Sequence, residues 1–270
     1  MVYEDSVLVL GGGLEVGRLA VHLTLDGVGV MLDYGVGFGE NGEPLLPLYK
    51  SPSEVKAIII SHAHLDHSGA APIFYVSTTI RAYMTKATRD LLKVMYNDFL
   101  HLSGYYLPFE HLEVRKLLRS TKAVSYGDVE EVNGVTLEFY DAGHIPGSMI
   151  TVVRGRRHSV AFTGDVNSVE TRLTRPADVA SIDADTLIIE STYALTNHPK
   201  RESVERRFIE AVREVVEDGG IVLVPAFSLG RSQEVLCVLH AYSNKISCPV
   251  YYDGMVREVN RIPVSYTHLR

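Results

Sequence analysis

The segment SHAHLDHSGA (61–70) crowds four side chains that can bind a divalent metal into six residues. These are His62, His64, Asp66 and His67. Only residues three or four apart share one face of a helix, so the four cannot act together from a helix. They directly follow the apolar run AIII (57–60), which predicts a buried strand. We therefore expect them on a loop at the carboxyl end of that strand, where one pair serves one metal and the next pair a second.

Two later segments supply further ligands directly after predicted strands. The segment DAGH ends in His144, and the segment TGD ends in Asp165. Each has a neighbouring glycine, which lets the backbone approach a metal closely. Alone, either residue would be interpreted as a turn residue or strand cap, but the histidine-rich segment upstream favours a shared metal site. Imidazole and carboxylate ligands suit zinc, with manganese as the alternative.

Strands must position these groups, and the first part of the chain is rich in strand-like runs separated by turn residues. A helical stretch covers 85–119, with a break near 103–108. The predicted strands are 7–10, 20–25, 28–33, 57–60, 135–142, 149–155, 158–164 and 186–192.

After Tyr193 the pattern changes to helices that alternate with apolar strands. Ser203 is a candidate cap for a helix that ends at Gly219, and a second helix covers 228–243. The runs IVLVPAF (221–227) and PVYYDG (249–254) predict strands. This alternation is typical of a parallel α/β unit, which places a domain boundary near residues 193–200.

Composition limits the class of protein. The 270 residues are 46% hydrophobic and 22% charged, as in globular proteins, and no apolar run reaches the length of a membrane span. The N-terminus does not resemble a signal peptide, and two cysteines are too few for a disulfide framework. We therefore expect a cytoplasmic protein without a membrane partner. The formal net charge of −7 argues against nucleic-acid binding through bulk positive charge, but not against an enzyme that grips a phosphate locally.

The motifs LDYG, SHAHLDH, AGHIPGS and TGD, in this order, resemble the metallo-β-lactamase fold over residues 1–190. The continuation IIESTYALTNHPKR and PAFSLGRSQEVL is similar to the β-CASP branch, which includes ribonuclease J and the nuclease subunit of the cleavage and polyadenylation factor. The N-terminal GGGLEVGR is most similar to archaeal and bacterial members. The resemblance implies an α/β fold class, a metallo-β-lactamase αββα sandwich followed by the first part of a β-CASP parallel α/β domain. Residues 1–193 would be the first domain, without its C-terminal strands, and 194–263 a partial β-CASP domain.

The resemblance also implies a two-zinc ribonuclease of RNA processing or decay, with Mn2+ as an alternative to Zn2+. A hydroxide bridging the two ions would attack an RNA phosphodiester in line. The family pattern assigns His62, His64 and His144 to the first zinc, Asp66 and His67 to the second, and Asp165 to a bridge between them.

Other carboxylates receive supporting roles from the same resemblance. Asp33, in MLDYG, would orient the histidine-rich loop by hydrogen bonds, and Glu190 would orient a later histidine near the leaving group. The implied catalytic carboxylates are thus Asp66, Asp165 and Glu190. For Asp33 and Glu190 the alternative is a structural acid that caps a turn.

Alternative functions stay open at this point. A DNA nuclease or another hydrolase could use the same fold, and a non-catalytic RNA-binding subunit is the alternative of a different class. RNA is the expected partner. Assembly into a homodimer or into an RNA-processing complex is an alternative that the sequence leaves open.

The terminal VSYTHLR (264–270) resembles a translated sequencing adapter, so we expect authentic sequence to stop near residue 263. The later histidine motifs of the family are absent from this sequence. On that ground we expect this chain to have a weakened second metal site and little or no nuclease activity.

Overall fold

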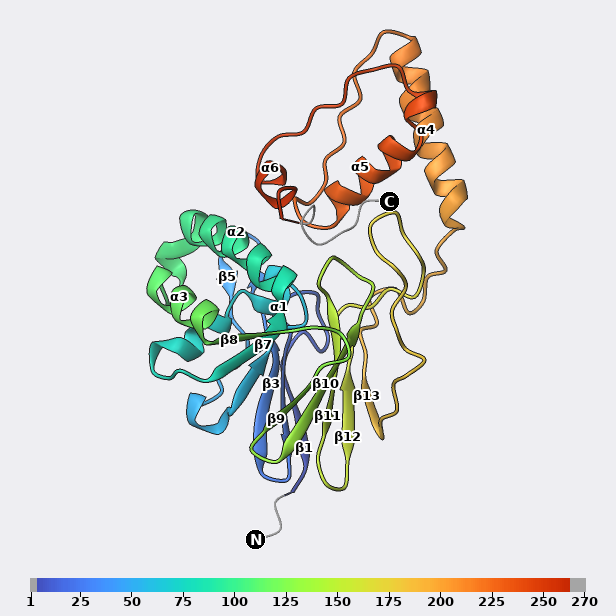
Figure 1. The fold of residues 1–270 in the computed structure, drawn as a ribbon. Helices are drawn as coiled ribbons and strands as arrows, with labels where there is room; N and C mark the ends of the chain where they lie inside the picture. The colour runs from blue at the N-terminus through green and yellow to red at the C-terminus, as the bar shows by residue number, and fades with distance from the viewer. Residues whose placement is uncertain (1–3, 263–270) are drawn as a thin grey trace.

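The computed structural model describes residues 4–262 as two facing β-sheets, with helices beside one sheet and a helical part beyond one end of the sandwich (Figure 1). The expected adapter-derived tail, residues 264–270, lies outside the described residues. Within residues 4–262, no helix has both the length and the apolarity needed to cross a membrane.

The first sheet has six strands in the order β1-β2-β3-β6-β7-β8. The first three form an antiparallel meander, whereas β3, β6, β7 and β8 are parallel. Parallel strands need crossover connections, and the histidine-rich loop is part of one of them. The strands are β1 (Ser6–Gly11), β2 (Ala20–Leu25), β3 (Val28–Tyr34), β6 (Ala57–Ile59), β7 (Arg81–Thr85) and β8 (Thr121–Val124).

The second sheet has five strands in the order β13-β12-β11-β10-β9. It is antiparallel except for the parallel pair β12 and β13. A small third sheet pairs β4 (Gly37–Phe38) with β5 (Pro44–Leu45). The strands of the second sheet are β9 (Val129–Val132), β10 (Val135–Asp141), β11 (Met149–Arg154), β12 (Ser159–Phe162) and β13 (Thr186–Ile188).

Helices α2 and α3 lie against strands β7 and β8 of the first sheet, and α4 to α6 belong to the end part (Figure 1). The predicted helical stretch 85–119 is confirmed as α2 and α3, which are separated at the predicted break. Thr85 caps α2 by accepting a hydrogen bond from the Thr88 amide at 3.1 Å. The helices are α1 (Leu65–Ser68), α2 (Lys86–Ser103), α3 (His111–Ser120), α4 (Arg201–Glu217), α5 (Arg231–Ala241) and α6 (Val256–Val259).

One hydrophobic core joins both sheets. Strand β3 is buried along its whole length because β2 and β6 flank it and other layers cover it. Strand β10 alternates instead, with Val135, Leu137 and Phe139 turned into the core. Apolar burial of this extent fixes the register of the strands whose ends carry the site. The predicted α/β sandwich is thus confirmed.

Two strand predictions in the end part are wrong. Residues 221–227 and 249–254 form no strand, and Ile221 and Phe227 are 94% and 85% exposed. A strand needs a neighbouring backbone to accept and donate its hydrogen bonds, and within residues 4–262 no segment pairs with either run. Strand β13 is also shorter than predicted and ends at Ile188.

Candidate metal centre

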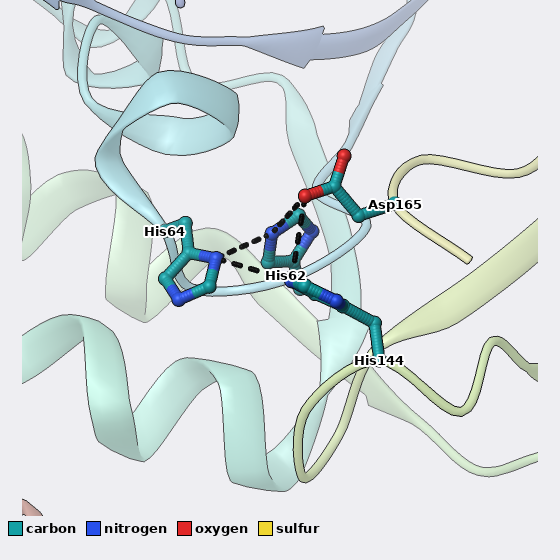
Figure 2. Close-up of side chains that lie close together, drawn as sticks. All are labelled: His62, His64, His144 and Asp165. Atoms are coloured by element: carbon teal, nitrogen blue, oxygen red, sulfur yellow. Dashed lines mark hydrogen bonds and ion pairs between the residues drawn. The ribbon is translucent and has the colours of Figure 1, made fainter. Parts of the chain in front are cut away.

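Strand ends from both sheets bring the predicted ligands to one edge of the sandwich. The histidine-rich segment follows β6, and His62 and His64 lie on the predicted loop, but Asp66 and His67 lie in the short helix α1 rather than on that loop. His144 follows β10, and Asp165 follows β12. Figure 2 shows His62, His64, His144 and Asp165 converging from these three strand ends. Their potential ligand atoms all lie within 4.8 Å of one another.

In this first cluster, three imidazoles surround one carboxylate oxygen. The Nε2 atom of His62 lies 3.0 Å from Nδ1 of His64, and Nε2 of His144 lies 3.4 Å from the same Nδ1. The Oδ2 atom of Asp165 lies 3.3 Å from His144 Nε2 and 3.8 Å from His62 Nε2. Three nitrogens and one oxygen are the donor set that a tetrahedral zinc ion accepts.

Hydrogen bonds on the outer side of the rings fix which nitrogen of His62 carries the proton. The Ser61 hydroxyl donates to Asp33 Oδ2 at 2.6 Å, so its oxygen is free to accept from the Nδ1–H of His62 at 3.0 Å. The Nε2 atom of His62 is therefore unprotonated and directed at the cluster. A fixed tautomer of this kind is what a metal-binding histidine requires.

His64 is fixed in the opposite tautomer. Its Nε2–H donates to the main-chain carbonyl of Leu229 at 3.3 Å, which leaves Nδ1 unprotonated. Two unprotonated nitrogens, of His62 and His64, thus face each other at 3.0 Å. Their lone pairs repel unless a cation lies between them, so this cluster fits a divalent metal.

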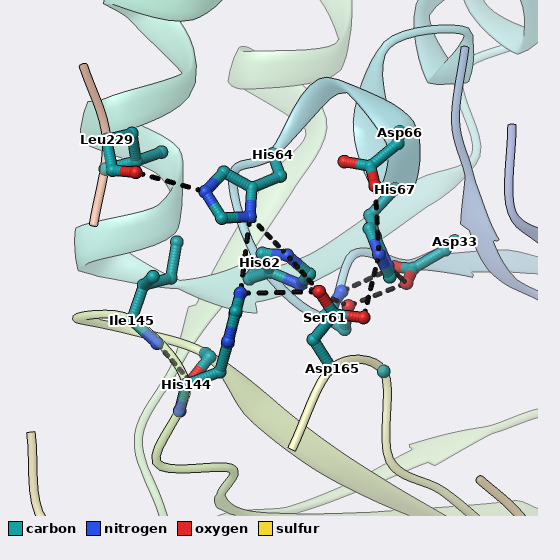
Figure 3. A network of polar contacts seen from close by, with 12 residues as sticks. Asp33, Ser61, His62, His64, Asp66, His67, His144, Ile145, Asp165 and Leu229 are labelled. Atoms are coloured by element: carbon teal, nitrogen blue, oxygen red, sulfur yellow. Dashed lines mark hydrogen bonds and ion pairs between the residues drawn. The ribbon is translucent and has the colours of Figure 1, made fainter. Parts of the chain in front are cut away.

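A second group of ligands lies on the other side of Asp165 (Figure 3). The Nδ1–H of His67 donates to Asp33 Oδ2 at 2.7 Å, so Nε2 is the nitrogen that faces inward. It lies 3.2 Å from Asp165 Oδ1 and 3.7 Å from Asp66 Oδ2. The two oxygens of Asp165 therefore face different clusters.

Asp33 supports both clusters from a fully buried position on β3. It accepts from the Ser61 amide at 2.7 Å, the Ser61 hydroxyl at 2.6 Å and the His67 ring at 2.7 Å. Burial raises the pKa of Asp33, and these donors oppose that rise. With only donors at both oxygens, the group is held as a carboxylate.

Titration behaviour differs between the two clusters. Burial lowers the pKa of His62 well below its usual range, lowers that of His64, and lowers that of His144 to about 4. Burial opposes protonation of His67 too, but hydrogen bonds with Asp165 and Asp33 outweigh it and hold the pKa of His67 well above its usual range. Burial alone would raise the pKa of Asp165, yet His67 and other imidazoles lower it to about 2. The first three histidines are thus neutral, as metal ligands must be.

Gly35 lets helix α1, which carries Asp66 and His67, approach the end of β3. A Cβ atom there would overlap the Asp66 carbonyl and come within 2.7 Å of the His67 amide nitrogen. We expect Gly35→Ala to lower the free energy of unfolding by about 2 kcal/mol, because α1 must shift. Urea denaturation tests this, with Gly104→Ala as the control because an added Cβ there meets open space. Equal stability of both variants would contradict the prediction.

Among residues 4–262, no hydrogen bond or ion pair joins the Glu190 side chain to either cluster. It lies two residues beyond β13, and its Oε2 accepts from the amide of Thr192 at 2.9 Å. This contact is the turn-capping role considered above. Its catalytic role stays a prediction.

Several supporting groups were not identified from the sequence. Ser61 lies inside the quoted motif, but only its contacts show that it joins Asp33 to His62. Ser148 accepts from the amides of His144 and Ile145 at 3.1 and 3.3 Å and so holds the His144 loop. The Leu229 carbonyl is a main-chain group, so the identity of the residue gives no indication that it would contact His64.

Comparison with known proteins agrees with this geometry. The family model described as the metallo-beta-lactamase superfamily matches residues 23–179. A protein named "RNase aCSPSF2" from Saccharolobus solfataricus is 48% identical over 96% of this chain and 52% of its own length. "Probable RNase MJ4" from Methanocaldococcus jannaschii is 36% identical over 98% of this chain and 63% of its own length. The chain thus spans about half to two thirds of these relatives.

A solved structure shows the same fold without indicating a function. It is a protein of unknown function from Enterococcus faecalis V583, with a TM-score of 0.52 and 16% sequence identity. The likeness covers 79% of this chain and 57% of that one.

Proposed function

We propose that this chain, which belongs to the metallo-beta-lactamase superfamily, carries the two-metal centre of a hydrolase that cleaves RNA phosphodiester bonds. The observation that carries the proposal is the position of Asp165. Its Oδ2 faces His62 and His144, whereas its Oδ1 faces His67. One carboxylate between two sets of ligands suits a pair of ions, and hydrolysis of phosphodiesters uses such pairs.

Residues of this chain would hold each ion and leave its outer side open. His62, His64 and His144 would hold the first, Asp66 and His67 the second, with Asp165 between them. When bound, zinc supplies Lewis acidity and lowers the pKa of a water molecule. The histidine rings of His62 and His67 are buried, but the carboxylate side chains of Asp66 and Asp165 are 38% and 29% exposed. The His144 side chain is 28% exposed, so a phosphate would approach from the side of Asp66, Asp165 and His144.

RNA as the substrate is supported by the relatives rather than by the site. Both relatives described above carry ribonuclease names, and both match nearly all of this chain. The β-CASP-like motifs continue into the end part, so we assign residues 1–193 to the hydrolase domain and 194–263 to part of a β-CASP domain. The side chain of Arg172 joins these parts by donating to Glu205 of α4 at 2.8 Å.

Zinc titration of the metal-free chain tests the proposal first. We expect two ions per chain, the second bound more weakly, by mass spectrometry of metal content and competition with a chromophoric chelator. RNA cleavage is then measured on a protein of the relatives' length, against DNA of the same sequence. A chain that binds no metal would support a non-catalytic binding subunit, and cleavage of DNA alone would support a DNA nuclease.

A further inference from the structure

One contact to the proposed metal centre comes from outside the two-sheet part of the molecule. The Leu229 carbonyl, which accepts from His64 Nε2–H at 3.3 Å, lies 165 residues further along the chain. It belongs to the loop 228–230 that leads into α5. Figure 3 shows Leu229 on the side of the His64 ring that faces away from His62.

A glutamine side chain aims this carbonyl. The Leu229 carbonyl and the Gly230 amide belong to one planar trans peptide group, so they point in opposite directions. The Gly230 amide donates to Gln233 Oε1 at 2.7 Å, and holding this end directs the other end at His64. Gln233 is itself buried, and its Nε2 donates to the Ser228 carbonyl at 3.0 Å and to Asn260 Oδ1 at 2.6 Å.

Packing also holds the loop 228–230 against the segment after β10, which carries His144. Leu229 and Ile145 are both buried in the common core, and Ile145 directly follows His144. Gly230 has φ +86°, and a Cβ atom there would lie 2.7 Å from Ile145 Cγ2. The loop therefore touches His64 through a hydrogen bond and the His144 segment through apolar contact.

We propose that Gln233 is a positioning residue for His64, acting through the Leu229–Gly230 peptide group. Seating of the loop 228–230 fixes the tautomer and ring orientation of His64, and metal binding in turn stabilises the seated loop, since coupling between two sites is reciprocal. The inference rests on the proposed function because it needs a metal in the first cluster. It adds that the end part of the molecule controls the affinity of that metal.

Zinc affinity of Gln233 variants tests the inference in the 270-residue chain. Gln233→Leu removes the acceptor for the Gly230 amide, and we expect the first zinc to bind about 10-fold more weakly, as when an outer hydrogen bond to a ligand is lost. Gln233→Glu keeps an acceptor oxygen for the Gly230 amide but loses the donor to Ser228 and Asn260, so its affinity should fall less than that of Gln233→Leu. Chelator competition measures each value.

Val238→Ala is the matched control. Val238 is buried on the same helix, and among residues 4–262 no hydrogen bond joins it to the loop 228–230. Its truncation should lower the melting temperature without changing zinc affinity. Equal weakening in Val238→Ala and Gln233→Leu would overturn the inference, because general destabilisation would then explain both.

Hydrogen exchange of the unmodified chain gives an answer even if Gln233→Leu does not fold. Zinc should slow exchange of the Gly230 amide, whereas exchange at the Val152 amide within β11 serves as the reference. Zinc binding without any slowing at Gly230 would overturn this inference and leave the proposed function standing. Failure of the unmodified chain to bind zinc would overturn both.

Discussion

Asp165→Asn is expected to lower RNA cleavage about 1,000-fold, or ~4 kcal/mol in transition-state stabilisation, in a protein of the relatives' length. The carboxylate places one oxygen at each cluster, 3.3 Å from His144 Nε2 and 3.2 Å from His67 Nε2. An amide supplies one neutral oxygen, and its NH2 group would face one of the two ions. Both cleavage of labelled RNA and zinc content per chain measure the effect.

Asp178→Asn is the control for this change. Asp178 is exposed, lies on the same segment after β12, and is not part of either cluster. It should leave zinc content and cleavage unchanged. Full cleavage by Asp165→Asn with two zinc ions retained would refute the bridging role and, with it, the proposed two-metal centre.

Asp33→Asn is expected to lower the free energy of unfolding by about 3 kcal/mol, because it breaks a buried and fully paired charge. Its Oδ2 now accepts from the Ser61 hydroxyl and the His67 ring. An amide NH2 there would donate instead, which favours the His67 tautomer with its proton on Nε2. That proton would block the inward nitrogen, so the second zinc should be lost before the first.

Asp26→Asn provides a control at a position with a similar positive φ. Asp26 and Asp33 both have positive φ, 51° and 56°, a region that asparagine tolerates as well as aspartate. Asp26 lies at the β2–β3 turn, where its carboxylate accepts from the amide of Arg156. Urea denaturation should show a much smaller loss for Asp26→Asn. A stable Asp33→Asn chain that still binds two zinc ions would show that Asp33 does not orient the loop.

Local sequence was sufficient to place the candidate ligands after a strand, although Asp66 and His67 lie in helix α1 rather than on a loop. His62, His64, Asp66 and His67 at this spacing cannot share a helical face, and the apolar run before them is strand β6. The structure places them after that strand, with His144 and Asp165 also after strand ends. Nearest-neighbour spacing and strand periodicity carry this information, because both depend on residues within about ten positions.

The strand predictions failed where a strand would need a partner segment that is far away in the sequence. The run 221–227 is as apolar as β3, but β3 has neighbours on both sides, whereas no segment within residues 4–262 pairs with 221–227. Apolar composition shows that a segment can be buried in a sheet, but it does not provide the partner strand.

By itself, the sequence determined the types of the candidate ligands, the crowding of four of them into one short segment, and the strands that precede them. Only the tertiary structure decided that Asp165 directs its two oxygens at different clusters, that Ser61 joins Asp33 to His62, and that the Leu229 carbonyl meets His64. These contacts join strand ends and loops that are up to 165 residues apart. Their geometry depends on how the two sheets and the end part pack together, and short-range patterns of residue types do not reveal that packing.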